Sequence, residues 1–156
     1  MAMLKIASLN CQGQTGITPA KALFINDLVK RNKYDILNLQ ETMINEDTFE
    51  LCDEIIRNYN VITNNTTNFY GTTCLIKNYY NIRDLRRDAE GRIIIFDIED
   101  ITYVNIYPKA GTDANSRNNR ENMFASILPN MLRYHKDHLI IAGDWNWFVH
   151  GFQPAL

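Results

Sequence analysis

The sequence predicts an α/β fold in which helices cover a layered sheet. Short segments rich in β-branched residues alternate with segments whose apolar residues recur every three or four positions, which indicates strands mixed with amphipathic helices. Tight turns join some of these strands and whole helices join others, so hairpins and crossovers both occur. With 156 residues, 46% of them hydrophobic, the chain is long enough for one domain with its own core.

The first half of the chain contains four segments with the composition of strands. The first of them ends at the turn formers Gln12 and Gly13. The second runs from Asp35 to Glu41, and the last two are short. The four segments are residues 5–10, 35–41, 61–63 and 72–76.

Two helices are predicted between these strands. Thr18 can cap the first helix, and Pro19 suits a position in its first turn. Residues 47–50, Asp-Thr-Phe-Glu, resemble a capping box at the start of the second helix. The residues expected to face the core are Leu23, Phe24, Leu28 and Val29 in the first helix and Phe49, Cys52, Ile55 and Ile56 in the second.

The second half predicts a hairpin, a long helix and a final strand. Residues 93–98 and 101–106 are β-branched and are separated by only two residues, which indicates a tight hairpin. Between residues 114 and 134 apolar pairs recur every four residues, as in an amphipathic helix, and Pro129 is expected to kink or split it. Residues 138–142 predict a buried strand.

Charge and composition exclude several classes of protein. Sixteen basic and eighteen acidic residues give a net charge of −2, which argues against a protein that coats nucleic acid by bulk charge. No apolar run approaches the ~20 residues that span a bilayer, and the first residues are too polar for a secretory signal. An intracellular protein is therefore expected. Cys11, Cys52 and Cys74 lack metal-ligand spacing and are predicted to be small buried residues in a reducing compartment.

Polar clusters stand at the carboxyl ends of four predicted strands: residues 10–12, 40–41, 105–107 and 144–146. Side chains at strand ends can converge on one rim of a sheet, where open α/β folds place their sites. Two of these side chains are carboxylates, Glu41 and Asp144, which can hold a hard cation such as Mg²⁺.

The remaining side chains of the four clusters suit a phosphate. Asn10 and Asn146 can hydrogen-bond a phosphate or orient a carboxylate or a water, and Tyr107 can donate to a phosphate oxygen. Together with the two carboxylates, this set predicts metal-assisted hydrolysis of a phosphoester.

The same clusters carry a resemblance to a known family. The segments Ser-Leu-Asn-Cys-Gln-Gly (8–13), Leu-Gln-Glu-Thr (39–42), Asn-Ile-Tyr-Pro (105–108) and Ala-Gly-Asp-Trp-Asn (142–146) resemble, in order and spacing, the endonuclease/exonuclease/phosphatase superfamily. Within it, the chain is most similar to the apurinic-endonuclease-like domain of LINE-type (non-LTR) retrotransposon polyproteins. Residues 71–74 and 88–92 are similar to that subgroup too.

This resemblance implies an αββα four-layer sandwich that cleaves phosphodiester bonds with Mg²⁺ or Mn²⁺. Glu41 matches the metal-binding glutamate, Asn10 the amide beside it, and Tyr107 the phosphate-contacting tyrosine. Asp144 and Asn146 match the pair that activates the attacking water and stabilises the transition state. The implied partner is chromosomal DNA, nicked in the nucleus to prime reverse transcription.

The sequence departs from the family's pattern in three places. Gln12 stands where repair-type relatives have a metal-binding aspartate. The resemblance covers residues 1–147 but only the front part of the family's domain, so a domain incomplete at its C-terminus is expected, with 148–156 as a divergent tail. The family's closing Asp-His element is not found, and His150 is the histidine on the correct side of the sheet to replace it.

Other interpretations stay open beside the DNA-nicking one. The chain can be a truncated, non-catalytic remnant that serves at most for binding or for dimerisation, because an apolar last strand without a neighbour favours a homodimer through that sheet edge. A phosphoinositide or sphingolipid head group is a third candidate substrate. Arg117 and Arg120 are candidate DNA contacts, against the alternative of a solvated face balanced by nearby acidic residues.

Overall fold

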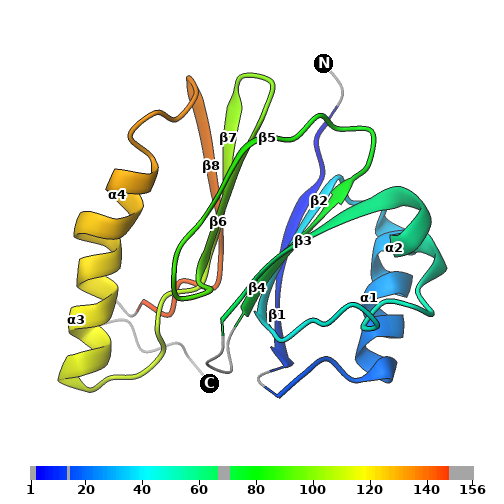
Figure 1. The fold of residues 1–156 in the computed structure, drawn as a ribbon, viewed down its shortest axis with the longest axis horizontal. Helices are drawn as coiled ribbons and strands as arrows, with labels where there is room; N and C mark the ends of the chain where they lie inside the picture. Colours follow the sequence, from blue (N-terminus) through cyan, green and yellow to red (C-terminus); the bar gives the residue numbers. More distant parts are fainter. Residues whose placement is uncertain (1–2, 14, 67–70, 148–156) are drawn as a thin grey trace, which may run out of the picture.

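A computed structural model describes residues 3–13, 15–66 and 71–147. Two four-stranded sheets pack face to face, and helices cover both outer faces (Figure 1). The first sheet has the order β1 (Ile6–Gly13), β2 (Ile36–Thr42), β4 (Gly71–Lys77), β3 (Tyr59–Asn65). The second has the order β5 (Arg83–Arg87), β6 (Ile93–Ile98), β7 (Ile101–Ile106), β8 (His138–Gly143).

The helices complete a four-layer αββα sandwich. The first sheet is covered by α1 (Pro19–Asn32) and α2 (Asp53–Asn58). The second is covered by α3 (Ala114–Asn122), the π-helical segment η1 (Met123–Ile127) and α4 (Leu128–Met131). The predicted α/β class and αββα architecture are therefore confirmed. The predicted tail, 148–156, lies outside the described residues.

Strand directions bring four carboxyl ends to one end of the sandwich. β1 runs parallel to β2, with α1 as the crossover, and β7 runs parallel to β8, with α3, η1 and α4 between them. In register, Asn10 lies opposite Gln40 and Ile106 lies opposite Gly143. We call the end of the sandwich where β1, β2, β7 and β8 finish the rim (lower part of Figure 1).

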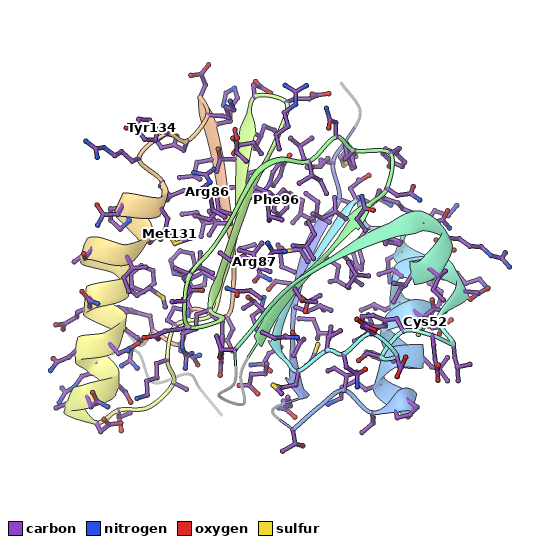
Figure 2. All side chains as sticks on the ribbon, viewed as in Figure 1. Cys52, Arg86, Arg87, Phe96, Met131 and Tyr134 are labelled. Atoms are coloured by element: carbon purple, nitrogen blue, oxygen red, sulfur yellow. The ribbon has the colours of Figure 1, made fainter. Side chains whose placement is uncertain are left out.

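The space between the sheets changes from apolar to polar toward the rim. Along β2 the residues that face the other sheet are Ile36, Asn38 and Gln40 in turn, since alternate strand residues share a face. Far from the rim, Ile36 packs in one apolar cluster with Phe96 and Tyr103, whose rings stack at 5.4 Å (Figure 2). Near the rim, buried amides take the place of these apolar groups.

Asn105 on β7 joins the two sheets. Its side chain is fully buried, and its amide nitrogen donates to the carbonyls of Leu39 (3.1 Å) and Thr73 (3.0 Å) in the first sheet. Its amide oxygen accepts from Gln40 Nε2 at 2.9 Å. Three hydrogen bonds from one side chain thus tie β7 to β2 and β4.

Asn26 explains two predictions that the structure overturns. Half of the predicted core face of α1 was wrong: Leu23 and Phe24 are exposed, and Ala22 and Ile25 are buried instead. The other half is confirmed, since Val29 is buried and Leu28 packs against the core. Asn26 lies on the buried face and accepts a hydrogen bond from the backbone N–H of Ile55, at the start of α2. A buried side chain with this role is polar, so the apolar pattern alone placed part of the face wrongly.

The predicted capping box at residues 47–50 is also wrong. Residues 46–51 form turns, and α2 begins only at Asp53 after Cys52, which makes no side-chain cap. The acceptor for the first turn comes from Asn26 on the neighbouring helix. Of the predicted stripe, Phe49, Cys52 and Ile55 are buried, whereas Ile56 is exposed.

Two edge strands differ from expectation. β5 was not predicted, because its sequence Arg-Asp-Leu-Arg-Arg has no apolar pattern; it pairs with β6, and Arg86 binds the buried Asp97 carboxylate at 3.2 Å and the Met131 carbonyl at 2.7 Å (Figure 2). β8 was predicted to be buried but is half-buried or exposed, since it lies at the edge of its sheet.

Three further predictions are confirmed. The hairpin of β6 and β7 turns at Glu99 and Asp100, with Glu99 in the left-handed region (φ 54°). The long helix is split just before Pro129: Met123–Ile127 are π-helical, and Pro129, which has no N–H to donate, lies in the first turn of α4. The three cysteines are free and buried.

We predict that Asn105→Leu lowers the free energy of unfolding by at least about 1–3 kcal/mol, because it removes three buried hydrogen bonds between the sheets. Urea denaturation followed by circular dichroism measures this loss. Asn118→Leu, on the exposed face of α3, is the matched control and should change stability little. Equal losses in the two variants would contradict a special role for Asn105.

Candidate active site

Four of the predicted site residues form a continuous arrangement at the rim. Asn10 donates its side-chain amide to Asp144 Oδ2 at 2.9 Å, and Tyr107 donates its hydroxyl to Glu41 Oε1 at 2.6 Å. Both bonds cross from one sheet to the other. Strand register brings the two pairs together within each sheet. In the first sheet Asn10 lies opposite Gln40, the residue before Glu41. In the second sheet Ile106, the residue before Tyr107, lies opposite Gly143, the residue before Asp144.

Arg92 contacts both the ring and the backbone of Tyr107. The Tyr107 ring is buried, and the Arg92 guanidinium lies over it, 5.2 Å from the ring centroid. Arg92 Nη1 also donates to the Tyr107 carbonyl at 3.1 Å. A buried cation beside the ring fixes the direction in which the tyrosine hydroxyl points, which is toward the Glu41 carboxylate.

Asp144 is oriented by two amides. Its Oδ2 accepts from the Asn10 side chain, and its Oδ1 accepts from the backbone N–H of Asn146 at 3.3 Å. Asn146 itself is anchored by its side chain, which donates to the Pro108 carbonyl at 2.9 Å. Each carboxylate oxygen thus has its own amide donor, and the carboxylate has a defined direction.

Backbone strain is concentrated at this rim. Gln12, Glu41 and Asn146 adopt positive φ angles of 49°, 53° and 46°, in the left-handed region that residues with a Cβ seldom occupy. Such residues persist only where the surrounding structure fixes them, and they cluster at functional sites. Within the described part of the chain, three of the six non-glycine residues with positive φ belong to the predicted site.

Gly143 allows β8 to reach β7 at the rim. Its φ is 152°, and a Cβ at this position would lie 1.9 Å from the carbonyl oxygen of Ile106. The same carbonyl accepts from the backbone N–H of Asp144 at 3.2 Å. Only glycine permits this approach, so the position of Asp144 depends on it.

The other predicted residues have varied surroundings. Gln12 is exposed, and its backbone N–H donates to Asn10 Oδ1 at 2.9 Å. Arg117 is exposed on α3, whereas Arg120 is buried and its Nη1 donates to the carbonyls of Lys109 and Gly111, both at 2.7 Å. His150 lies outside the described residues.

Cys11, beside Asn10 on β1, has no sign of a reactive thiol. Burial raises the pKa of its thiol to about 12, and the charge of Lys21 offsets only part of that rise. The thiolate needed for nucleophilic or metal chemistry is therefore scarce near neutral pH. The chemistry of the rim depends on oxygen and amide groups instead.

The rim suits a cation that takes few protein ligands. Within residues 3–13, 15–66 and 71–147, no group of three or more His, Cys, Asp or Glu side chains gathers as a metal cage would require. Glu41 and Asp144 are two carboxylates on strand ends that meet, and both are half-buried. Mg²⁺ is commonly held by one or two carboxylates together with water and substrate phosphate, so the donor set fits that ion.

No protein-family model matches the chain, and no curated protein does. Solved structures match it closely in shape. An AP endonuclease from Archaeoglobus fulgidus superposes with a TM-score of 0.71 at 23% identity, over 92% of this chain and 58% of that one. Truncated TDP2 from Caenorhabditis elegans gives 0.69 at 16% identity, over 93% and 63%.

A 3′ phosphatase, NExo, from Neisseria bound to a product DNA hairpin gives a TM-score of 0.71 at 18% identity, over 92% of this chain and 58% of that one. The chain has the endonuclease/exonuclease/phosphatase fold. It spans 48–63% of the length of the first solved structures that it matches. No helix within the described part of this fold is long and apolar enough to cross a membrane.

The sequence pattern does not reveal the residues that position the site. Arg92 has the pattern of a solvated face, but it is buried against Tyr107. In the sequence Asn105 only begins a polar cluster, and its hydrogen bonds across the sheets were not predicted. One feature of the sequence could have indicated that Arg92 is buried: it directly precedes the apolar residues of β6.

We predict that Gly143→Ala lowers the free energy of unfolding by more than the ~1–3 kcal/mol that left-handed strain alone costs, because the new Cβ collides with the Ile106 carbonyl. Gly16→Ala is the matched control, since Gly16 has a φ of 127° and a Cβ there would have no atom within 4 Å. Chemical denaturation compares the two. A loss at Gly16 as large as at Gly143 would contradict the importance of the close approach.

Proposed function

We propose that this chain is the part of a DNA-nicking phosphodiesterase domain that binds the metal ion and the scissile phosphate. The observation that supports the proposal is the pair of hydrogen bonds that cross the rim, from Tyr107 to Glu41 and from Asn10 to Asp144. They bring carboxylates, a phenol and an amide of the predicted types to one place. Phosphodiester hydrolysis needs three functions that these groups can supply: charge stabilisation, phosphate contact and water activation.

Glu41 and Asp144 are the residues that would hold Mg²⁺ or Mn²⁺. The ion, when bound, supplies a Lewis acid for a phosphoryl oxygen of the substrate. The Tyr107 hydroxyl fixes the direction of Glu41 by donating to Oε1. Arg92 in turn keeps Tyr107 in place, so the direction of the Glu41 carboxylate is set before any substrate binds.

Asp144 is proposed to accept the proton of the attacking water. The Asn10 amide holds its Oδ2 and the Asn146 backbone holds its Oδ1, so the carboxylate presents its remaining lone pairs in a fixed direction. The hydroxide then attacks phosphorus, the P–O bond to the leaving oxygen breaks, and that oxygen departs with the bonding electron pair and takes a proton from bulk water. As negative charge grows on the phosphate, the second N–H of the Asn146 side chain is proposed to contact it, and the Tyr107 hydroxyl is proposed to turn from Glu41 to the phosphate.

The proposed substrate is DNA. The match to an AP endonuclease and to a 3′ phosphatase seen with a DNA hairpin supports this class of substrate. The resemblance of the rim motifs to LINE-type retrotransposon domains supports the finer proposal that the nick primes reverse transcription, in the nucleus. Arg117, exposed on α3, remains a proposed DNA contact, and the buried Arg120 is proposed to act by shaping the loop at Lys109 and Gly111.

We predict that the chain nicks supercoiled plasmid in Mg²⁺ and that Glu41→Gln and Asp144→Asn each lower the rate about 10²–10⁴-fold, the usual contribution of a positioned acid–base or charge-stabilising group. EDTA should abolish nicking, and Mn²⁺ should restore it. Agarose gels of nicked against supercoiled plasmid measure the rates. Glu99→Gln and Asp137→Asn, which alter exposed carboxylates at the end of the second sheet opposite the rim, are the matched controls.

The result also separates catalysis from binding alone. Wild-type protein that binds Mg²⁺ by calorimetry but does not nick would favour the alternative of a non-catalytic remnant. Nicking that survives both rim substitutions would contradict the assignment of Glu41 and Asp144.

We also propose that the edge of β8 pairs with the same edge of a second copy. β8 bonds to β7 on one side, and its apolar residue Leu139 is 37% exposed. An apolar edge strand is a template for strand pairing. We predict that the protein sediments as a dimer and that Leu139→Lys converts it to a monomer; a wild-type monomer at high concentration would contradict the pairing.

A further inference from the structure

Both tryptophans of the chain lie beside the candidate active site. Trp145 stands between Asp144 and Asn146, and Trp147 follows Asn146 directly. Their side chains are 42% and 51% exposed. Singly exposed apolar residues are ordinary, but two exposed indoles in contact with one ring form a larger apolar patch, which is the kind of surface that marks a binding site.

Phe124 of η1 holds the two indoles in a defined orientation. The Trp145 ring is parallel to the Phe124 ring, with an interplanar angle of 1° and centroids 5.6 Å apart. Trp147 meets the same ring edge-on, at 88° and 5.6 Å. The parallel, offset contact with Phe124 covers only part of one face of Trp145, and 42% of the residue remains exposed.

We propose that the exposed face of Trp145 is a stacking platform for one unpaired nucleobase next to the scissile phosphate. The inference deepens the proposed function and depends on it. Asp144 faces the first sheet, whereas the indole of Trp145 lies on Phe124 in the outer helical layer. A strand whose phosphate reaches Asp144 and continues over that layer would bring a neighbouring base to the indole. Every base has a flat π face, so such a platform accepts bases of different sequence.

An unpaired base fits this platform better than duplex DNA does. In a duplex each base is already stacked on both sides, and its faces are closed to a protein side chain. The indole, which packs against Phe124, can stack on a base but offers no set of hydrogen bonds that would distinguish one base from another. The site should therefore favour single-stranded, flipped or end-frayed DNA over a fully paired helix.

The ligand-side test compares two oligonucleotides that bind to wild-type protein in EDTA, where no cleavage occurs. One is a short thymine oligonucleotide, and the other has the same number of phosphates but abasic sugars. We expect the thymine oligonucleotide to bind about 5–150-fold more tightly, the contribution of one stacked base. Fluorescence anisotropy of end-labelled oligonucleotides measures both affinities. Equal affinities would overturn the proposal.

The protein-side test uses the two tryptophans as reporters. In Trp147→Phe the only tryptophan emission comes from Trp145, and thymine oligonucleotide should quench it, whereas the abasic one should not. Trp145→Leu should lose the preference for bases and keep its affinity for the abasic oligonucleotide. Tyr134→Leu is the matched control, because Tyr134 is 81% exposed at the opposite end of the sheet (Figure 2).

The outcomes distinguish this inference from the proposed function. If Trp145→Leu does not fold, the comparison of oligonucleotides on wild-type protein still decides. Base-dependent quenching without plasmid nicking would support the platform and contradict the proposed hydrolysis. Nicking without any base dependence in affinity or emission would overturn the platform and leave the hydrolysis standing.

Discussion

The hydrogen bonds of Asn105 are the interaction on which the rest of this structure depends. A sandwich of two sheets can slide, because apolar contacts between the sheets have little directional preference. Asn105 removes that freedom by binding two carbonyls and one amide of the opposite sheet. Since Tyr107 lies two residues further along the chain, fixing Asn105 also fixes where the Tyr107 hydroxyl meets Glu41.

The rim concentrates features that cost stability elsewhere in proteins. Left-handed Glu41 and Asn146, the crowded Gly143 and several buried amides all lie at this one end of the sandwich. Apolar packing at the other end of the interior, around Ile36 and Phe96, offsets the free-energy cost of these features. The polarity gradient along β2 thus separates two ends: one holds the sandwich together through apolar contacts, and the other presents the polar groups of the candidate site.

The sequence predicted the rim better than it predicted the helices. The clusters around Asn10, Glu41, Tyr107 and Asp144 were expected to converge because parallel strands end at one edge, and the cross-sheet hydrogen bonds bear out that convergence. Leu23 and Phe24 of α1 were wrongly placed in the core because the buried face contains Asn26, whose partner, the start of α2, is 29 residues away. Local apolar patterns carry no information about such a distant partner.

The hydrophobic pattern of the sequence also fails to predict which charged residues are buried. The arginines between residues 83 and 92 have the pattern of a solvated loop, yet Arg86 binds buried Asp97 and Arg92 lies against Tyr107. Their long side chains extend from the surface into the fold, so burial of the guanidinium does not require an apolar sequence. In this molecule the arginines connect β5 and β6 to the outer helix and to the rim. A pattern read only for hydrophobicity therefore identifies the strands that form the core but overlooks the cations that aim its reactive groups.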